Sequence, residues 1–122
     1  MEKEFLDYPE ALELKELGFD SKEFISYVFV DTDNIFFESN GFCPNSSIWA
    51  PTFSQAFRWF REEYNFDSYI RPNIVINIPK TYQFNINDNT YDTWYETYLE
   101  AELECLKKLI EIVKINQDDH II

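Results

Sequence analysis

Glycine and histidine are nearly absent from this sequence, and each shortage removes a class of function. Only two glycines occur among 122 residues, which disfavours a disordered or low-complexity chain and leaves no glycine-rich phosphate loop. The single histidine, His120, lies in a tail that we expect to fray. A Ser/His/Asp or Cys/His catalytic arrangement therefore lacks a suitable base, and we predict that the protein is not an enzyme.

Cysteine is almost as scarce. Cys43 and Cys105 are the only two, and they stand far apart without a CxxC pattern. Together with one histidine they cannot supply the ligands of a typical zinc site. We expect two reduced thiols in a cytoplasmic protein, with no metal ion or other cofactor. Carboxylates are abundant, so a paired-carboxylate site stays open, but no pair is distinguished from the others.

Basic residues are few and long apolar runs are missing. Ten Lys and Arg side chains stand against 23 Asp and Glu, a net charge of -13. This balance argues against direct binding to nucleic acid or to an anionic membrane surface. No apolar run approaches the length of a membrane span, and the first residues lack the character of a signal peptide. We therefore predict no membrane partner.

Hydrophobic side chains, by contrast, are plentiful, at 45% of the chain, with aromatic residues at 19%. This composition can fill a core, and the length suits one domain. We predict a single domain over residues 1–122, with residues 1–6 and 116–122 frayed.

Residues 97–114 predict a long amphipathic helix that organises the core. Its apolar residues follow two neighbouring lines at helical spacing. The lines are Leu99, Leu103, Leu106, Ile110 and Val113, and Tyr98, Ala101, Cys105, Leu109 and Ile112. We expect this wide face to be buried.

Two shorter helices are predicted before it. Asp7 with Glu10, and Thr52 with Gln55, have the spacing of capping boxes. Gly18 and Asn65 follow the apolar periodicity of each helix and can adopt the left-handed conformation that ends a helix.

Two hairpins are predicted between the helices. Residues 24–30 and 35–38 are rich in aromatic and β-branched side chains. Residues 73–78 and 82–86 alternate apolar and polar around a Pro79-Lys80 turn. The polar members should face solvent or a wet interface. They are Asn73, Asn77, Gln83, Asn85 and Asn87.

The resulting pattern is αββ-αββ-α. It predicts an α+β fold with an antiparallel sheet of two hairpins and the helices packed on one face. The three helix starts share a cap, an aromatic residue, an acid or amide, and an alanine, Ala11, Ala56 and Ala101. This internal repeat favours a duplication, although capping boxes also recur in unrelated helices.

Four residues are candidates for contact with a partner. Trp49 lies in a long irregular stretch, residues 39–51, and can either contact a partner or, as we favour, pack on the core. Arg58, Trp59 and Arg61 could grip an acidic or aromatic partner. The favoured alternative is that both arginines pair with the chain's own carboxylates.

Three helical segments resemble a group of small uncharacterised proteins carried by phages and other mobile elements of gut anaerobes. The segments are residues 11–19, 52–64 and 98–114. The resemblance implies a cytoplasmic, phage-related setting and brings no activity, cofactor or catalytic residue.

Two functions compete. The first is a non-enzymatic protein-protein interaction module, which acts through a sheet face, the 39–51 loop or self-association. The second is an acidic inhibitor that mimics nucleic acid and occupies a host DNA-binding or defence protein. A mimic should line its carboxylates in rows on one face, whereas an ordinary acidic protein should scatter them.

Overall fold

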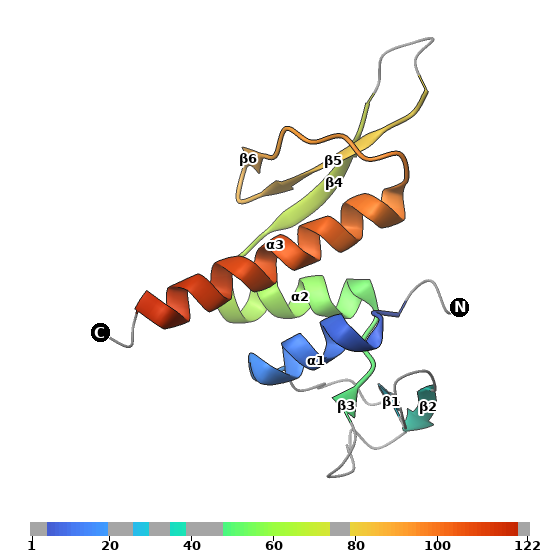
Figure 1. The fold of residues 1–122 in the computed structure, drawn as a ribbon, viewed down its shortest axis with the longest axis vertical. Helices are drawn as coiled ribbons and strands as arrows, with labels where there is room; N and C mark the ends of the chain where they lie inside the picture. Colours follow the sequence, from blue (N-terminus) through green and yellow to red (C-terminus); the bar gives the residue numbers. More distant parts are fainter. Residues whose placement is uncertain (1–4, 20–25, 30–34, 39–47, 74–78, 120–122) are drawn as a thin grey trace. The chain divides into compact units, whose positions relative to one another are not determined.

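The fold combines helices and antiparallel sheets, as the α+β prediction requires. The computed structural model describes residues 5–19, 26–29, 35–38, 48–73 and 79–119 (Figure 1). In chain order the elements are α1 (Tyr8–Glu16), β1 (Ser26–Phe29), β2 (Ile35–Glu38), β3 (Ile48–Trp49), α2 (Phe53–Tyr64), β4 (Ser68–Pro72), β5 (Tyr82–Ile86), β6 (Asn89–Thr90) and α3 (Tyr98–Asp119).

The chain divides into two compact units within α2, residues 1–56 and residues 57–122. The first unit contains a three-stranded sheet in the order β2-β1-β3. Both pairings are antiparallel, and the pairing of residues 26–29 with residues 35–38 agrees with the predicted strand partners. Residues 30–34, which join the two strands, lie outside the described residues.

A small apolar cluster joins α1 to this sheet. Ala11, Phe29, Ile48 and Ala50 are buried together, and the ring of Tyr8 meets that of Phe29 edge-on at 5.4 Å between centroids. The chain before α1 is tied in by the Leu6 N–H, which donates to the Pro51 carbonyl at 2.9 Å.

The second unit contains the sheet β4-β5-β6, with antiparallel pairings throughout. Helix α3 contacts both β5 and β4 and lies beside them in Figure 1. Tyr82 lies on the face toward α3, because its ring contacts that of Tyr98 at 5.7 Å. Side chains two residues apart share a face, so Phe84 and Ile86 also face α3.

The predicted partner of β5 is wrong. We expected residues 73–78 to pair with residues 82–86 around Pro79-Lys80, but β5 pairs with β4, with Pro72 opposite Tyr82. Residues 74–78 lie outside the described part of the chain. Strand β4 escaped prediction because a five-residue segment with an arginine and a proline carries little strand signal.

Strand β6 was also missed, and a two-residue turn creates it. Asn87 and Asp88 have φ values of 50° and 68°, as in the type I′ turns that join twisted antiparallel strands. The Asn87 side-chain oxygen accepts a bond from the Asp67 N–H at 2.9 Å. This bond holds the turn at the start of β4.

Two of the three predicted helix caps are confirmed. Thr52 and Gln55 exchange the two bonds of a capping box, at 2.9 and 3.1 Å. The Thr97 hydroxyl accepts the Glu100 N–H at 3.1 Å. Asp7 makes no side-chain cap bond. Pro9 at the second helical position explains part of this, because proline lacks one of the N–H groups that a cap side chain binds.

The predicted helix ends are confirmed for α1 and α2. Gly18 has φ 100° and Asn65 has φ 59°. The Phe19 N–H donates to the Leu14 carbonyl and the Gly18 N–H to the Lys15 carbonyl, which is the Schellman pattern. Helix α3 continues to Asp119, five residues beyond the end of the helix predicted at residue 114.

The buried stripe of α3 is narrower than the sequence predicts. Six residues on two neighbouring lines at helical spacing are buried: Ala101, Cys105, Leu106, Leu109, Ile110 and Val113. Tyr98 and Leu99, expected on the buried face, are 50% and 39% exposed. The first turn of α3 therefore presents apolar side chains to solvent.

The proposed duplication is not confirmed. The central strand of the first sheet is β1, the first strand after its helix, whereas the central strand of the second sheet is β5, the second strand after its helix. The two halves share similar helix starts but order their strands differently. The strands within the described residues also form two antiparallel sheets, whereas a single one was expected.

Candidate functional site

The four predicted contact residues do not form one exposed surface. Trp49 is only 8% exposed, as the packing alternative requires. The Arg58 Nε lies 3.2 Å from the Glu62 carboxylate, with both side chains more than half exposed, so this arginine pairs within its own helix. Trp59 is half-buried and meets Phe60 and Tyr64 edge-on. Arg61 is exposed on α2.

A different set of exposed side chains, close together in the sequence, is the stronger candidate for a contact site. Trp94, Tyr98 and Leu99 are 47%, 50% and 39% exposed, and six consecutive positions contain all three. We call them the α3 entry cluster. Large exposed apolar groups that gather in one place are characteristic of interaction sites, whereas single ones are ordinary.

Local structure explains why this cluster is exposed. The Tyr95 N–H and carbonyl both bond to Tyr82, at 2.7 and 2.8 Å, and the Tyr95 ring stacks on Phe84 with 6.3 Å between centroids. Tyr95 thus anchors this connection to β5. Its neighbour Trp94 is not buried in the same way and remains 47% exposed.

The cap of α3 places the remaining two side chains. Thr97 starts the helix, so Tyr98 and Leu99 occupy its first turn. The Tyr98 ring contacts Tyr82 edge-on, which limits its freedom while leaving half of it open. A partly anchored aromatic side chain loses little further entropy when it binds.

Acidic groups adjoin the cluster. Glu96 and Glu100 are exposed next to it in the chain. Burial raises the pKa of Tyr98, and the nearby Glu102 raises it further. The Tyr98 hydroxyl therefore stays protonated at neutral pH and can donate a hydrogen bond. An apolar centre with a polar rim is the usual composition of a protein interface.

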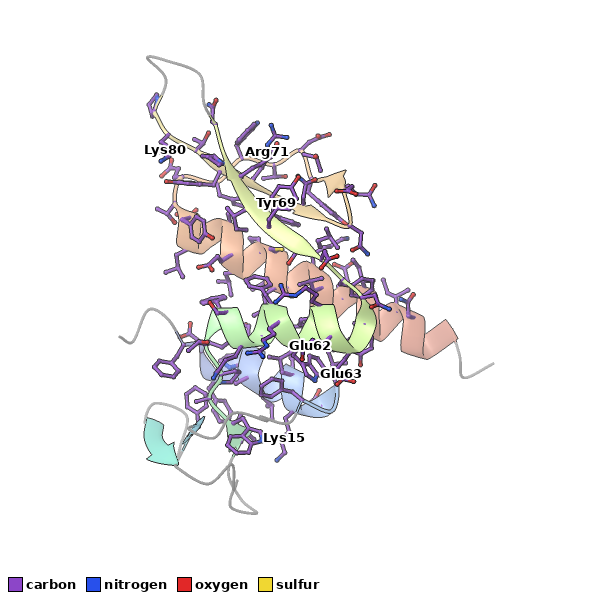
Figure 2. All side chains as sticks on the ribbon, turned by 180° about the vertical axis from the view of Figure 1, so that it is seen from behind. Lys15, Glu62, Glu63, Tyr69, Arg71 and Lys80 are labelled. Atoms are coloured by element: carbon purple, nitrogen blue, oxygen red, sulfur yellow. The ribbon has the colours of Figure 1, made fainter. Side chains whose placement is uncertain are left out.

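On the sheet face opposite α3, strand β4 presents further exposed side chains. Tyr69 and Arg71 of β4 lie opposite Asn85 and Gln83 of β5, and Tyr69 is 53% exposed. Figure 2 shows Tyr69 and Arg71 along β4, seen from behind.

Two polar residues of that face contradict the sequence prediction. Gln83 and Asn85 are 5% and 1% exposed instead of facing solvent. The Gln83 amide donates to the Tyr91 carbonyl at 3.3 Å, and the Asn85 oxygen accepts the Thr90 hydroxyl at 2.7 Å. The chain at and after β6 supplies both partners. Of the remaining members, Asn87 is exposed, Asn73 is half-buried, and Asn77 lies outside the described residues.

Cys105 is not a reactive site. It is a free thiol, completely buried in α3. Burial raises its pKa to about 12, against a smaller opposing effect of a hydrogen bond with Ser68. It therefore stays protonated and a poor nucleophile at neutral pH. Within the described residues, no group of three or more His, Cys, Asp or Glu side chains could hold a metal ion.

No described helix is both long enough and apolar enough to cross a membrane. Neither the family models, the curated proteins nor the solved structures compared with this chain include a match. The resemblance to phage and mobile-element proteins thus stays a prediction.

Proposed function

We propose that the protein is a non-enzymatic protein-protein interaction module, and that the α3 entry cluster is its contact surface. The observation that carries the proposal is the exposure of Trp94, Tyr98 and Leu99 within six consecutive positions. Tryptophan and tyrosine are the residue types most enriched at the energetic centres of protein interfaces. The phage-related, cytoplasmic setting belongs to the same proposal.

The partner surface should be apolar or weakly basic. A net charge of -13 repels nucleic acid and favours a partner with some positive charge around its contact. The exposed apolar side chains of the cluster would supply affinity, and the neighbouring Glu96 and Glu100 would supply orientation and speed of encounter.

The alternative of a nucleic-acid mimic rests on the same net charge. The middle section of helix α3 gives the mimic alternative little support. Lys107 lies 3.7 Å from the Glu104 carboxylate, and Lys108 lies 3.5 Å from that of Glu111. Opposite charges thus alternate along this part of the helix, whereas a mimic needs uninterrupted rows of carboxylates.

An affinity capture with matched variants tests the proposal. The tagged protein, Trp94→Ala/Leu99→Ala and Ile115→Ala are each incubated with a lysate of the cells in which the protein occurs. Ile115 is 52% exposed on the same helix and therefore controls for the loss of exposed apolar surface. A specific partner should be retained by the wild type and by Ile115→Ala and lost with the double variant.

Salt distinguishes the two functions. Apolar contacts of the entry cluster should persist at high ionic strength, because screening acts on charges. The opposite result would be capture of DNA-binding proteins by the wild type and the double variant alike, lost at high salt. That result would contradict the entry-cluster proposal and favour the mimic.

A further inference from the structure

Strand β4 has a backbone edge that no described strand occupies. Within the described residues, β4 pairs only with β5, so it forms one edge of the sheet. Exposed edges present unpaired N–H and C=O groups, and natural proteins usually shorten, charge or interrupt them. Strand β4 has the sequence Ser-Tyr-Ile-Arg-Pro, and only some of its backbone N–H and C=O groups point toward this edge.

The hydrogen bonds at each end of β4 define which of its backbone groups point outward. The Asn73 N–H donates to the Thr81 carbonyl, and the Asn87 N–H donates to the Asp67 carbonyl. Both pairs continue the β4–β5 register. In an antiparallel ladder the bonding direction alternates along each strand, so Tyr69 and Arg71 also bond toward β5. Ser68, Ile70 and Pro72 therefore direct their backbone groups away from it.

Pro72 agrees with this assignment. Proline has no N–H, and within sheets it is confined to positions whose N–H would point away from the neighbouring strand. The outward edge consequently offers two N–H donors, those of Ser68 and Ile70. It also offers carbonyl acceptors at Ser68, Ile70 and Pro72.

We propose that this edge binds a second copy of the chain, with the two β4 strands antiparallel about a two-fold axis at Ile70. Ile70 of each copy would then donate to and accept from Ile70 of the other. The Ser68 N–H of each copy would donate to the Pro72 carbonyl of the other. All four bonds use groups that point outward, and the missing N–H of Pro72 leaves only the Ser68 carbonyl without a donor.

The side chains of β4 favour a second copy over an unrelated strand. The same axis places Tyr69 of one copy opposite Arg71 of the other, and it does so twice. Arginine over a tyrosine ring is a favourable cation–π pair, and directly opposed side chains are the main stabilising contacts between strands. Both side chains are exposed and lie on the same face of the sheet, opposite α3. Tyr69 and Arg71 stand on either side of Ile70 and attract each other. A strand with such a pair around its central residue is suited to a symmetric contact with a second copy of itself.

Charge is also compatible with this pairing at β4. The strand carries Arg71 and no acidic residue, so the contact opposes no carboxylates within β4 despite the net charge of the chain. The repulsion between two chains of charge -13 acts over a longer distance and is screened by salt. Self-association should therefore strengthen as ionic strength rises from low to physiological values.

Sedimentation equilibrium of the purified full chain tests the inference through a residue exchange. The wild type should form dimers. Tyr69→Arg places two arginines opposite each other at both sites and should weaken the dimer about tenfold or more. Arg71→Tyr should weaken it less. The combined exchange Tyr69→Arg/Arg71→Tyr rebuilds both pairs with their members reversed and should restore wild-type affinity.

The controls separate this inference from a loss of fold and from the entry cluster. Arg61→Tyr removes the same charge from an exposed position of α2 and should leave the dimer intact. Trp94→Ala/Leu99→Ala should also leave it intact, because the inference does not rest on the proposed function. A wild type that is monomeric at every attainable concentration would overturn the pairing. So would a combined exchange that stays as weak as Tyr69→Arg.

Discussion

Leu106 is completely buried near the middle of α3. Leu106→Ala removes side-chain volume that the surrounding core can only partly refill, so we expect it to lower the free energy of unfolding by about 2–5 kcal/mol. The urea midpoint measures this loss. Lys107→Ala, at the next and exposed position, should change stability by only about 0.5 kcal/mol. Equal midpoints for wild type and Leu106→Ala would mean that the helix face is not a core surface.

Glu102 should make stability depend on pH in an unusual direction for a carboxyl group. Burial raises its pKa, so the native state holds this proton more tightly than the unfolded chain does. Its stabilising effect is complete below the unfolded pKa and is lost as pH rises through the folded pKa. Glu102→Gln should therefore be more stable than the wild type at neutral pH, and the difference should shrink toward about pH 4.

Urea midpoints of both proteins across this pH range measure the effect. Glu111→Gln, at an exposed carboxyl of the same helix, provides the control and should show no comparable gain. A Glu102→Gln advantage that grows on acidification would contradict the direction of the pKa shift.

Conformation at single residues could be predicted where the cause is local. Gly18 and Asn65 have positive φ values, as expected, because few other residue types adopt that conformation at low cost. The burial of Asn85 could not be predicted, because its hydrogen-bond partner Thr90 lies on a strand that the sequence did not reveal. The exposure of Trp94 likewise could not be predicted, because it depends on the pairing of the next residue, Tyr95, with Tyr82 of β5.

Among the elements, α2 and α3 should depend on their threonine caps. Both hydroxyls accept a backbone N–H from the first turn. Thr52→Ala and Thr97→Ala should each lower the free energy of unfolding by about 0.5–2 kcal/mol. Ser54→Ala removes a hydroxyl from an exposed position within α2 and should cost less than either. Denaturant midpoints measure all three, and unaffected midpoints for both threonine variants would exclude a stabilising role for the caps.

Helices were predicted better than strands for a physical reason. A helix is defined by contacts within its own sequence, so caps and periodicity locate it. Strand β4 became recognisable only through its pairing with β5, and β6 only through the Asn87-Asp88 turn. The α3 entry cluster was missed because the apolar pattern of α3 already starts at Tyr98 and Leu99. The buried residues of the helix start only at Ala101.

For the whole molecule, the excess of acidic residues should make stability increase with salt. A net charge of -13 destabilises a compact state through self-repulsion. Raising the ionic strength to about 0.15 M shortens the Debye length to about 8 Å and should raise the melting temperature by a few degrees. Differential scanning calorimetry measures this. KCl and NaCl at equal ionic strength should act alike, and a melting temperature that falls with salt would show that attractive ion pairs dominate.

At this scale the sequence predicted the fold class but not the topology. Alternation and helical periodicity identify the secondary structures, and their mixture gives the α+β class. The order of strands depends on pairings between distant segments, which is why the similar starts of α1 and α2 did not reveal that the two sheets are arranged differently.

The short β6 strand also determines how large any assembly through β4 can become. It contains only Asn89 and Thr90, and beyond it the same side of β5 is bonded to Tyr91 and Tyr95. A strand this short is a poor template for another chain, so β4 is the only long edge of this sheet within the described residues. When two copies pair through β4, the long edge of each copy is occupied by the other. Growth should stop there, and concentrated protein should accumulate as closed pairs rather than as fibrils.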